Sequence, residues 1–267
     1  MRLRPIAGVV LRQIYLLRGS PVRILPMFAW VAVDIILWGF ITRYLNSVGS
    51  SGHNFVPQLL GAVLFWDFFA RIMQGINVAF LEDVWSRNFL NLFATPLRIS
   101  EYVTGLVLTS IGTSMFGLVV MLLLATLIFG LPFLSLGLML VPLFAVLFLF
   151  GIALGILANA MVLRLGPASE WLIWPLPALL APFAGVFYPI ATLPAWMQAV
   201  ARALPPSYVF EALRAAVAGH GNGSGGLAWA AALALVQVLI AAWVFTRVYR
   251  HVVRSGLLAR YSAESVG

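Results

Sequence analysis

The sequence predicts an all-α integral membrane protein with six transmembrane helices. Of its 267 residues, 63% are hydrophobic and only 9% are charged, whereas about a quarter of the residues of a soluble domain are charged. Six stretches are mostly apolar over about 20 residues, the length of a membrane-crossing helix. They are residues 25–44, 55–80, 102–129, 136–163, 171–188 and 227–249. We expect one domain, with an interface helix at 1–23, the six-span bundle at 25–249 and a tail at 250–267.

The positions of the arginines predict which ends of the helices face the cytoplasm. All sixteen basic residues are arginine. With both termini in the cytoplasm, twelve arginines fall in inner segments, while Arg43, Arg202 and Arg214 fall in outer ones and Arg71 lies within the second span. Cytoplasmic loops of membrane proteins carry the excess of positive charge. The basic residues cluster at membrane edges and not on a soluble face, so they do not indicate a nucleic-acid partner.

Residues 1–23 precede the first span and combine basic with apolar residues. Pro5 is suited to the first turn of a helix. Ile6, Val10, Ile14 and Leu17 then recur at helical spacing. This pattern indicates an amphipathic helix in the inner headgroup layer. The alternative is a positively charged segment that only fixes the topology.

The second span contains a polar stripe. Asp67, Arg71, Gln74 and Asn77 are three or four residues apart and therefore share one helical face. A charge at mid-membrane costs about 3 kcal/mol or more, so such a stripe must face protein or water. It either lines a substrate route or moving interface, or it holds the bundle together.

The fourth span carries small residues at regular spacing. Gly151, Gly155 and Asn159 are four residues apart, and small residues at this spacing allow two helices to approach closely. Packing within the chain and a contact between subunits are both consistent with this pattern.

The segment between the second and third spans is too short and polar to cross a membrane. Trp85, Phe89 and Phe93 are four residues apart, and Leu92 lies beside them, so one helical face is apolar. Pro96 ends the predicted helix. This apolar face meets either a partner protein or the N-terminal helix.

The fifth span is interrupted by prolines at 175, 177, 182 and 189. Each proline removes a backbone donor and strains the preceding turn. The following stretch, 194–219, contains helix starts at Pro194 and at Pro205 to Pro206. We expect two short helices that dip into the outer leaflet and return, with Glu211 and Arg214 paired three residues apart.

Residues for catalysis are lacking in this sequence. There is no cysteine, and the three histidines lie in separate segments. Without lysine the chain lacks the residue that a P-loop places on the β- and γ-phosphates. We therefore expect no enzyme activity, no metal and no cofactor in this chain.

Three stretches resemble the ABC-2 type permeases, the membrane subunits of exporters for polysaccharides, lipo-oligosaccharides and drugs. The first is the basic N-terminal segment. The second is "NLFATPLRISEYVTG", residues 91–105, and the third is "GVFYPIATLPAWMQAVARALPPSYVFEALR", residues 185–214. The third contains a Pro-x-Trp, a Pro-Pro and a Glu-x-x-Arg, which is the most specific of the three matches.

The resemblance implies a complex in the bacterial inner membrane. Two permease copies, identical or merely similar, would form the pore, and two separate ABC ATPase subunits would bind ATP and Mg²⁺. The family's coupling helix, which docks onto the ATPase, would correspond to Trp85, Phe89, Leu90, Leu92, Phe93, Thr95 and Pro96. Membrane lipid is the remaining expected partner.

Aromatic residues in the second and fifth spans are candidate contacts for an amphipathic substrate. They are Phe65, Trp66, Phe69, Trp171 and Trp174. The alternative for the two later tryptophans is anchoring at the membrane interface. The rival function is a channel or ion-coupled carrier that needs no ATPase and uses Asp67 as its coupling site.

Overall fold

The computed structural model describes residues 2–19, 21–48, 55–86, 88–130, 137–218 and 224–257, without the side chains of 21–28, 30, 31, 55–58, 90, 93, 224 and 225. The described residues form helices and connecting turns, with no strand among them. The predicted all-α fold is confirmed.

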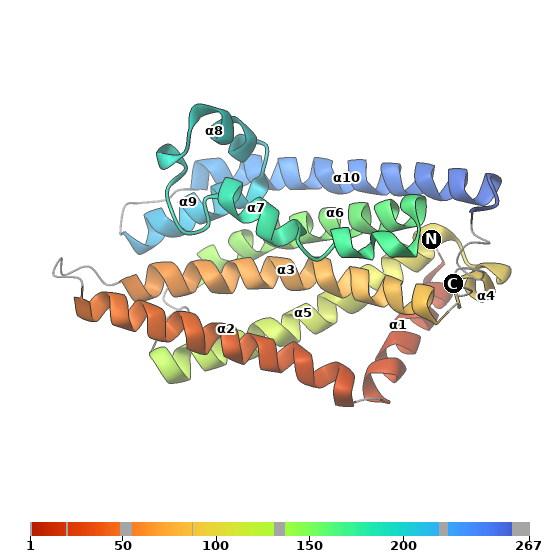
Figure 1. Cartoon of the computed structure of the whole chain (residues 1–267), viewed down its shortest axis with the longest axis horizontal. Coiled ribbons are helices and arrows are strands. Elements are labelled where there is room, and N and C mark those ends of the chain that lie inside the picture. Colours follow the sequence, from red (N-terminus) through yellow and green to blue (C-terminus); the bar gives the residue numbers. More distant parts are fainter. Residues whose placement is uncertain are drawn as a thin grey trace.

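Long helices form the body of the molecule and run roughly along its long axis (Figure 1). They are α2 (Pro21–Val48), α3 (Phe55–Trp85), α5 (Ile99–Phe129), α6 (Leu140–Leu165) and α10 (Ser224–Arg254). Four described stretches are long and apolar enough to cross a membrane: Leu59–Trp85, Ile99–Phe129, Gly137–Leu165 and Gly226–Arg254. α2 covers the predicted first span and, at 28 residues, is about 42 Å long.

The core lies between α3 and the helices around it. α10 packs on α6, α6 on α3, and α3 on both α5 and α2. A Cβ added to Gly151 would lie 3.0 Å from Ile72, and one added to Gly155 would lie 3.1 Å from Ile76. The two glycines of α6 therefore serve packing within the chain, against α3. Of the two uses that the spacing allowed, the structure shows this one.

The predicted fifth span is not one continuous helix. Residues 171–188 fall on a 3-10 helix, η2 (Pro167–Leu172), a turn, and α7 (Leu176–Ala184). α7 has nine residues and spans about 14 Å, which is too short to cross a bilayer alone. The prolines explain the break, because they start α7 and remove donors that a continuous helix would need. The count of six spans remains a prediction.

Two short helices follow, as predicted. The chain passes through η3 (Ile190–Thr192) to α8 (Ala195–Arg202) and α9 (Pro205–Val217). Pro194 precedes α8, and Pro205 and Pro206 occupy the first turn of α9. The proline signals thus placed both helix starts correctly, because proline lacks only a donor that the first turn does not use.

The predicted N-terminal helix is present as α1 (Leu3–Arg18) and packs against α5. Its buried face differs from the predicted stripe. Ile6, Val9 and Gln13 are buried, whereas Ile14 is exposed. Apolar residues of α1 lie on the side that packs against the protein and also on the exposed side. The predicted stripe of apolar residues therefore coincides with only part of the buried face.

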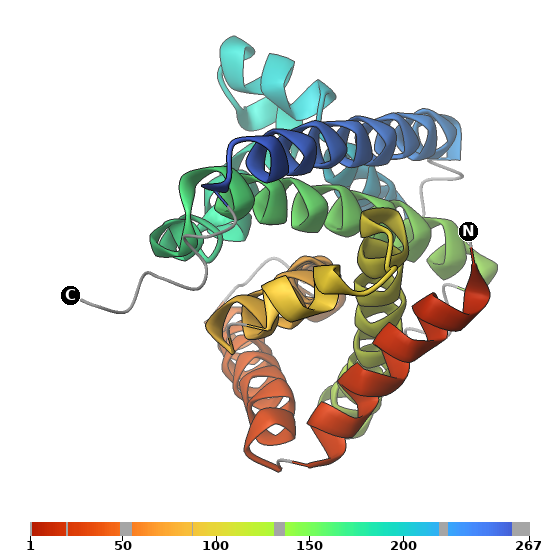
Figure 2. The same cartoon turned by 90° about the vertical axis from the view of Figure 1, so that its right-hand side faces the viewer.

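α1 and the short helix α4 (Phe89–Ala94) lie together at one end of the bundle, where α3, α6 and α10 end and α5 begins (Figure 1). Figure 2 looks onto this end and shows α1 crossing it obliquely beside α5. α1 begins and α10 ends at this same end of the bundle (Figure 1).

Candidate functional site

Helix α4 is bound to its own chain through Phe89. The Phe89 side chain is 1% exposed. Its ring makes edge contacts with Phe80 of α3 and Tyr102 of α5, with centroid distances of 5.6 and 6.1 Å. The two alternatives for the apolar face of α4 were a partner protein and the N-terminal helix, and neither describes Phe89, whose ring packs against α3 and α5. The spacing of the aromatics predicted an apolar face but not the surface that covers it.

The other residues proposed for coupling differ in exposure. Leu92 is partly buried against the core, while Thr95 and Pro96 are exposed. Trp85 is half exposed, and its Nε1 donates to Glu170 Oε2 at 2.7 Å. The side chains of Leu90 and Phe93 lie outside the described residues. Among the described side chains of α4, those of Asn91 and Ala94 are exposed, and the turn at Thr95 and Pro96 is exposed beside them.

A buried carboxylate joins three helices beneath α4. Asp83 of α3 is fully buried. It accepts hydrogen bonds from the guanidinium of Arg12 in α1 and, at 2.7 Å, from the hydroxyl of Tyr102 in α5. This contact could not be predicted from the sequence pattern alone, because Arg12 and Asp83 are 71 positions apart. The Asp83 carboxylate thus connects α1, α3 and α5 through hydrogen bonds.

A second ion pair fastens the start of α1. Arg2 donates to Glu101 of α5 at 3.1 Å and to the carbonyl oxygen of Pro96. The hydrogen bond and the charge of Glu101 raise the pKa of the Arg2 guanidinium, which stays positively charged. Glu101 also accepts from the backbone N–H of Arg98 at 3.1 Å, closing the first turn of α5. α1 is therefore tied both to α5 and to the connection that leaves α4.

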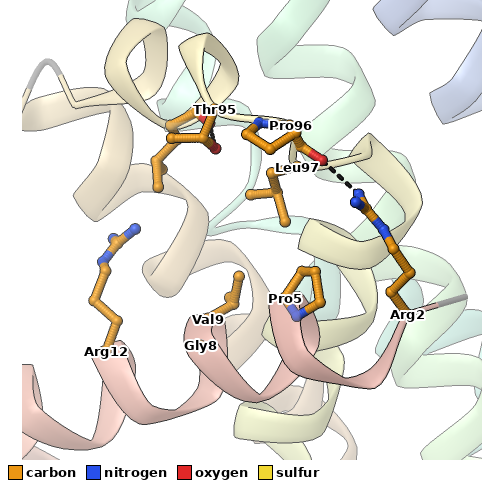
Figure 3. A pocket seen from close by; sticks show the side chains of 9 residues that line it. Arg2, Pro5, Gly8, Val9, Arg12, Thr95, Pro96 and Leu97 are labelled. Carbon is orange, nitrogen blue, oxygen red and sulfur yellow. Dashed lines mark hydrogen bonds between the residues drawn. The ribbon is translucent and has the colours of Figure 1, made fainter.

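A cavity of about 320 Å³ lies between α1 and this connection (Figure 3). Its α1 side consists of Arg2, Pro5, Gly8, Val9 and Arg12, and its other side of Leu92, Thr95, Pro96 and Leu97. In Figure 3 the two arginines stand at opposite ends of the row. The walls between them are largely apolar.

The polar stripe of the second span is partly paired. Arg71 donates from Nε and Nη2 to Asp67 Oδ2, both at 2.9 Å, and both side chains are partly exposed. Gln74 is also partly exposed. Asn77 is fully buried, and its amide has no hydrogen-bond partner among the described residues. The polar stripe thus begins at the partly exposed Asp67–Arg71 ion pair and ends at Asn77, which is buried among the helices.

A carboxylate that sequence reasoning did not single out lies near this pair. Asp34 of α2 is partly exposed and interacts electrostatically with both Asp67 and Arg71. The available signal was an acidic residue inside an otherwise apolar first span, since such residues are expensive and are mostly functional. Asp34 therefore adds a carboxylate on α2 that interacts electrostatically with the Asp67–Arg71 pair of α3.

The aromatic candidates separate into two groups. Phe65 and Phe69 are fully buried and stack on Phe144 and Phe150 of α6, at 4.4 and 5.2 Å. They belong to the α3–α6 interface in this structure, so contact with a substrate would require repacking.

The tryptophans are more accessible. Trp66 is partly buried beside Phe210, with a centroid distance of 6.0 Å. Trp171 is 77% exposed and Trp174 41% exposed. Both alternatives for the latter two, substrate contact and interfacial anchoring, stay open.

Glu211 and Arg214 of α9 form the expected ion pair, at 2.9 Å. Glu211 Oε1 also accepts from the backbone N–H of Ile190 at 2.8 Å, and Arg214 Nη1 donates to the carbonyl of Gly185 at 2.7 Å. Gly185 has φ of 61°, a conformation that glycine adopts without strain. The Glu211–Arg214 pair therefore stabilises the packing of the turn after α7 against α9.

Among the described residues there is no group of three or more histidine or acidic side chains that could hold a metal ion.

Comparison with known proteins identifies a family. The family model described as ABC-2 type transporter matches residues 20–217, which run from the start of α2 to the end of α9. A search of curated proteins finds no match.

Proposed function

Because this chain belongs to the ABC-2 type transporter family, we propose that it is the permease subunit of an ATP-driven exporter. Permeases of this family normally work with ABC ATPase partners. In this proposal, two ATPase subunits bind ATP and Mg²⁺ at the α4 end of the bundle, which faces the cytoplasm. Two permease copies, identical or similar, enclose the route for an amphipathic substrate.

The observation that supports coupling most directly is the attachment of α4. A helix that transmits force must be held firmly by the bundle while exposing a surface to its partner. Phe89 provides the first property, because it is buried between α3 and α5. Asn91, Ala94 and Thr95 provide the second, because all three are exposed. A push on α4 would therefore reach α3 and α5 directly.

The route in this proposal follows the partly exposed face of α3. Asp67, Arg71 and Gln74 lie there, and Asp34 approaches from α2. In a membrane such groups are stable only against protein or water. A second permease copy or a water-filled route would satisfy this requirement. The exposed Trp171 and Trp174 are the remaining candidates for contact with the apolar part of a substrate.

The test is purification of the tagged chain from its own cells, followed by measurement of ATPase activity. We expect the wild type to retain a subunit that contains a P-loop. Ala94→Trp should lower the amount of retained ATPase, whereas Ala232→Trp, at an exposed position of α10, should not. Phe89→Asp is not a clean test, because it would place a charge in the core. A wild-type chain that transports without any bound ATPase would overturn the proposal.

The rival proposal is an ATPase-independent channel or ion-coupled carrier that uses Asp67. The proximity of Asp34, Asp67 and Arg71 favours it, since intramembrane ionisable groups often mark ion routes. Asp67→Asn distinguishes the two proposals. A carrier should lose the dependence of its transport on an ion gradient, whereas a permease should keep its dependence on ATP.

A further inference from the structure

Helix α10 ends in three exposed arginines that lie on one face. Arg247, Arg250 and Arg254, which we call the arginine row, follow Trp243 at steps of three or four residues. At 100° per residue the four side chains lie within an arc of roughly 60°. The opposite side of α10 packs on α6 and α9, and its buried residues include Ala234, Ala241, Phe245 and Val252. The arginine row therefore points directly away from the rest of the protein.

The arginine row has no acidic partner in the described part of the chain. α10 contains no aspartate or glutamate, and none of the three arginines takes part in an ion pair between described residues. The guanidinium carbon of Arg247 lies 5.0 Å from the centre of the Trp243 ring. A ring attracts the positive charge but supplies no oxygen acceptor, so the N–H groups of Arg247 remain available to an anion.

The position of the row along α10 matches the edge of a bilayer. Trp229 is exposed on the same face, 18 residues before Arg247, which is about 27 Å along a helix. The hydrocarbon core of a bilayer is about 30 Å thick, and tryptophans gather at its edges. With Trp229 at one edge, Arg247 falls at the other, and Arg250 and Arg254 reach about 4 and 10 Å farther, into and beyond the headgroups. Between the two edges the face is apolar and exposed, with Val236, Leu239 and Ile240.

Two general roles of basic residues account for only part of this arrangement. Arginines at the end of a span help to orient the chain, and cations in the last turn offset the helix dipole. Neither role requires the residues to share a face. The dipole effect is confined to the last turn, whereas Arg247 precedes Arg254, the last residue of α10, by seven positions. The common face and its apolar continuation therefore indicate a ligand that is anionic at one end and apolar at the other.

We propose that the arginine row binds the phosphate of an anionic phospholipid, whose acyl chains lie along Val236, Leu239 and Ile240. In the expected topology this end of α10 faces the cytoplasm, where anionic lipids attract basic residues close to the membrane surface. α10 lies on the opposite side of the bundle from α1, with α6 between them (Figures 1 and 2). It also lies outside residues 20–217, which match the family model. The inference thus goes beyond the proposed function and needs no ATPase.

The test is titration of the purified full-length chain in detergent with dioctanoyl phosphatidylglycerol, followed by native mass spectrometry. Dioctanoyl phosphatidylcholine, which has no net charge, is the reference lipid and should bind the wild type more weakly. The double variant Arg247→Gln, Arg250→Gln should bind phosphatidylglycerol about 25-fold more weakly than the wild type, at about fivefold per arginine. Both positions are exposed, so the variant should keep the elution volume and thermal midpoint of the wild type in detergent alone.

Two further variants separate a site from an effect of total charge. Arg43→Gln with Arg202→Gln removes the same charge from exposed positions on α2 and α8, and this control should bind phosphatidylglycerol as the wild type does. Arg247→Lys with Arg250→Lys keeps the charge and should retain most of the affinity at low salt, with a loss at high salt.

Four results would overturn the inference. They are equal binding of the two lipids to the wild type, unchanged phosphatidylglycerol binding in the glutamine variant, an equal loss of binding in the Arg43 and Arg202 control, and no loss at high salt. If the glutamine variant binds the lipid normally but retains less ATPase, the row contacts the ATPase and the lipid site is wrong. Failure of the wild type to retain any ATPase would count against the proposed function and leave the lipid inference intact.

Discussion

The attachment of α4 through Phe89 leads to a quantitative prediction. Phe89→Ala removes a fully buried ring that contacts Phe80 and Tyr102. Such a truncation costs about 3–5 kcal/mol in a protein core. α4 has only six residues and exposes its other side, so we take about 3 kcal/mol. The loss falls on the contact between α4 and the bundle and not on the bundle itself.

The free energy lost in the Phe89→Ala variant determines how often α4 separates from the bundle. At 1.4 kcal/mol per factor of ten, about 3 kcal/mol raises the open population of α4 roughly 100-fold. Hydrogen exchange measured by mass spectrometry reports the fraction of molecules in which α4 is open. We expect about 100-fold faster exchange of the Leu92 and Thr95 amides, whose donors bond to Asn88 and Leu92 at 3.0 and 3.3 Å. Asn91→Ala, at an exposed position of α4, is the control and should leave exchange almost unchanged.

Two results would refute this reasoning. Unchanged exchange in the Phe89→Ala variant would mean that Phe89 does not attach α4 to the bundle. Equally faster exchange throughout α3 and α5 would mean that α4 does not open separately from them.

Two further predictions concern the packing of the long helices. Tyr102→Phe removes the 2.7 Å hydrogen bond to buried Asp83 and should cost about 1.5–3 kcal/mol, measured as a lower thermal midpoint in detergent; an unchanged midpoint would show that this hydroxyl contributes nothing. Gly155→Leu should destabilise the chain by about 1–3 kcal/mol or prevent its accumulation, because even a Cβ there would lie 3.1 Å from Ile76. Gly112→Leu, where an added Cβ meets nothing within 4 Å, should be tolerated, and equal loss in both variants would contradict the packing argument.

Local signals allowed much of the fold to be predicted. The apolar stretches at 55–80, 102–129 and 227–249 fall on long helices, and most of the described part of 136–163 falls on α6. Pro194 and Pro205 marked α8 and α9 because the preference of proline for a first turn depends only on the chain nearby. The same residue type also explains why the predicted fifth span is not continuous, since Pro175 and Pro177 lie where α7 begins and remove donors that a longer helix would need.

Contacts between distant residues could not be predicted in the same way. The Trp85–Phe89–Phe93 spacing shows that α4 has an apolar face, but only the fold shows that Phe80 and Tyr102 cover Phe89. The pairs Arg2–Glu101 and Arg12–Asp83 join residues 99 and 71 positions apart.

Charge placement gave a partial signal for these pairs. Asp83 and Glu101 lie close in sequence to Arg87 and Arg98, which the predicted topology places on the same side of the membrane as the arginines before the first span. Which of them meet depends on the direction in which α1 crosses the bundle (Figure 2).

The close fit of α6 on α3 restricts how these two helices can move relative to each other. Ile72 faces Gly151 and Ile76 faces Gly155, with Leu147 and Asn159 one turn beyond on either side. A slide by one turn would bring Ile72 onto Leu147 in one direction, or Ile76 onto Asn159 in the other. Each isoleucine now packs against a glycine, which has only a hydrogen in place of a side chain. After either shift, one isoleucine would face a full side chain and would clash with it. Motion in this molecule is therefore expected to proceed by rotation of the α3–α6 pair as one body, and not by sliding along their shared face.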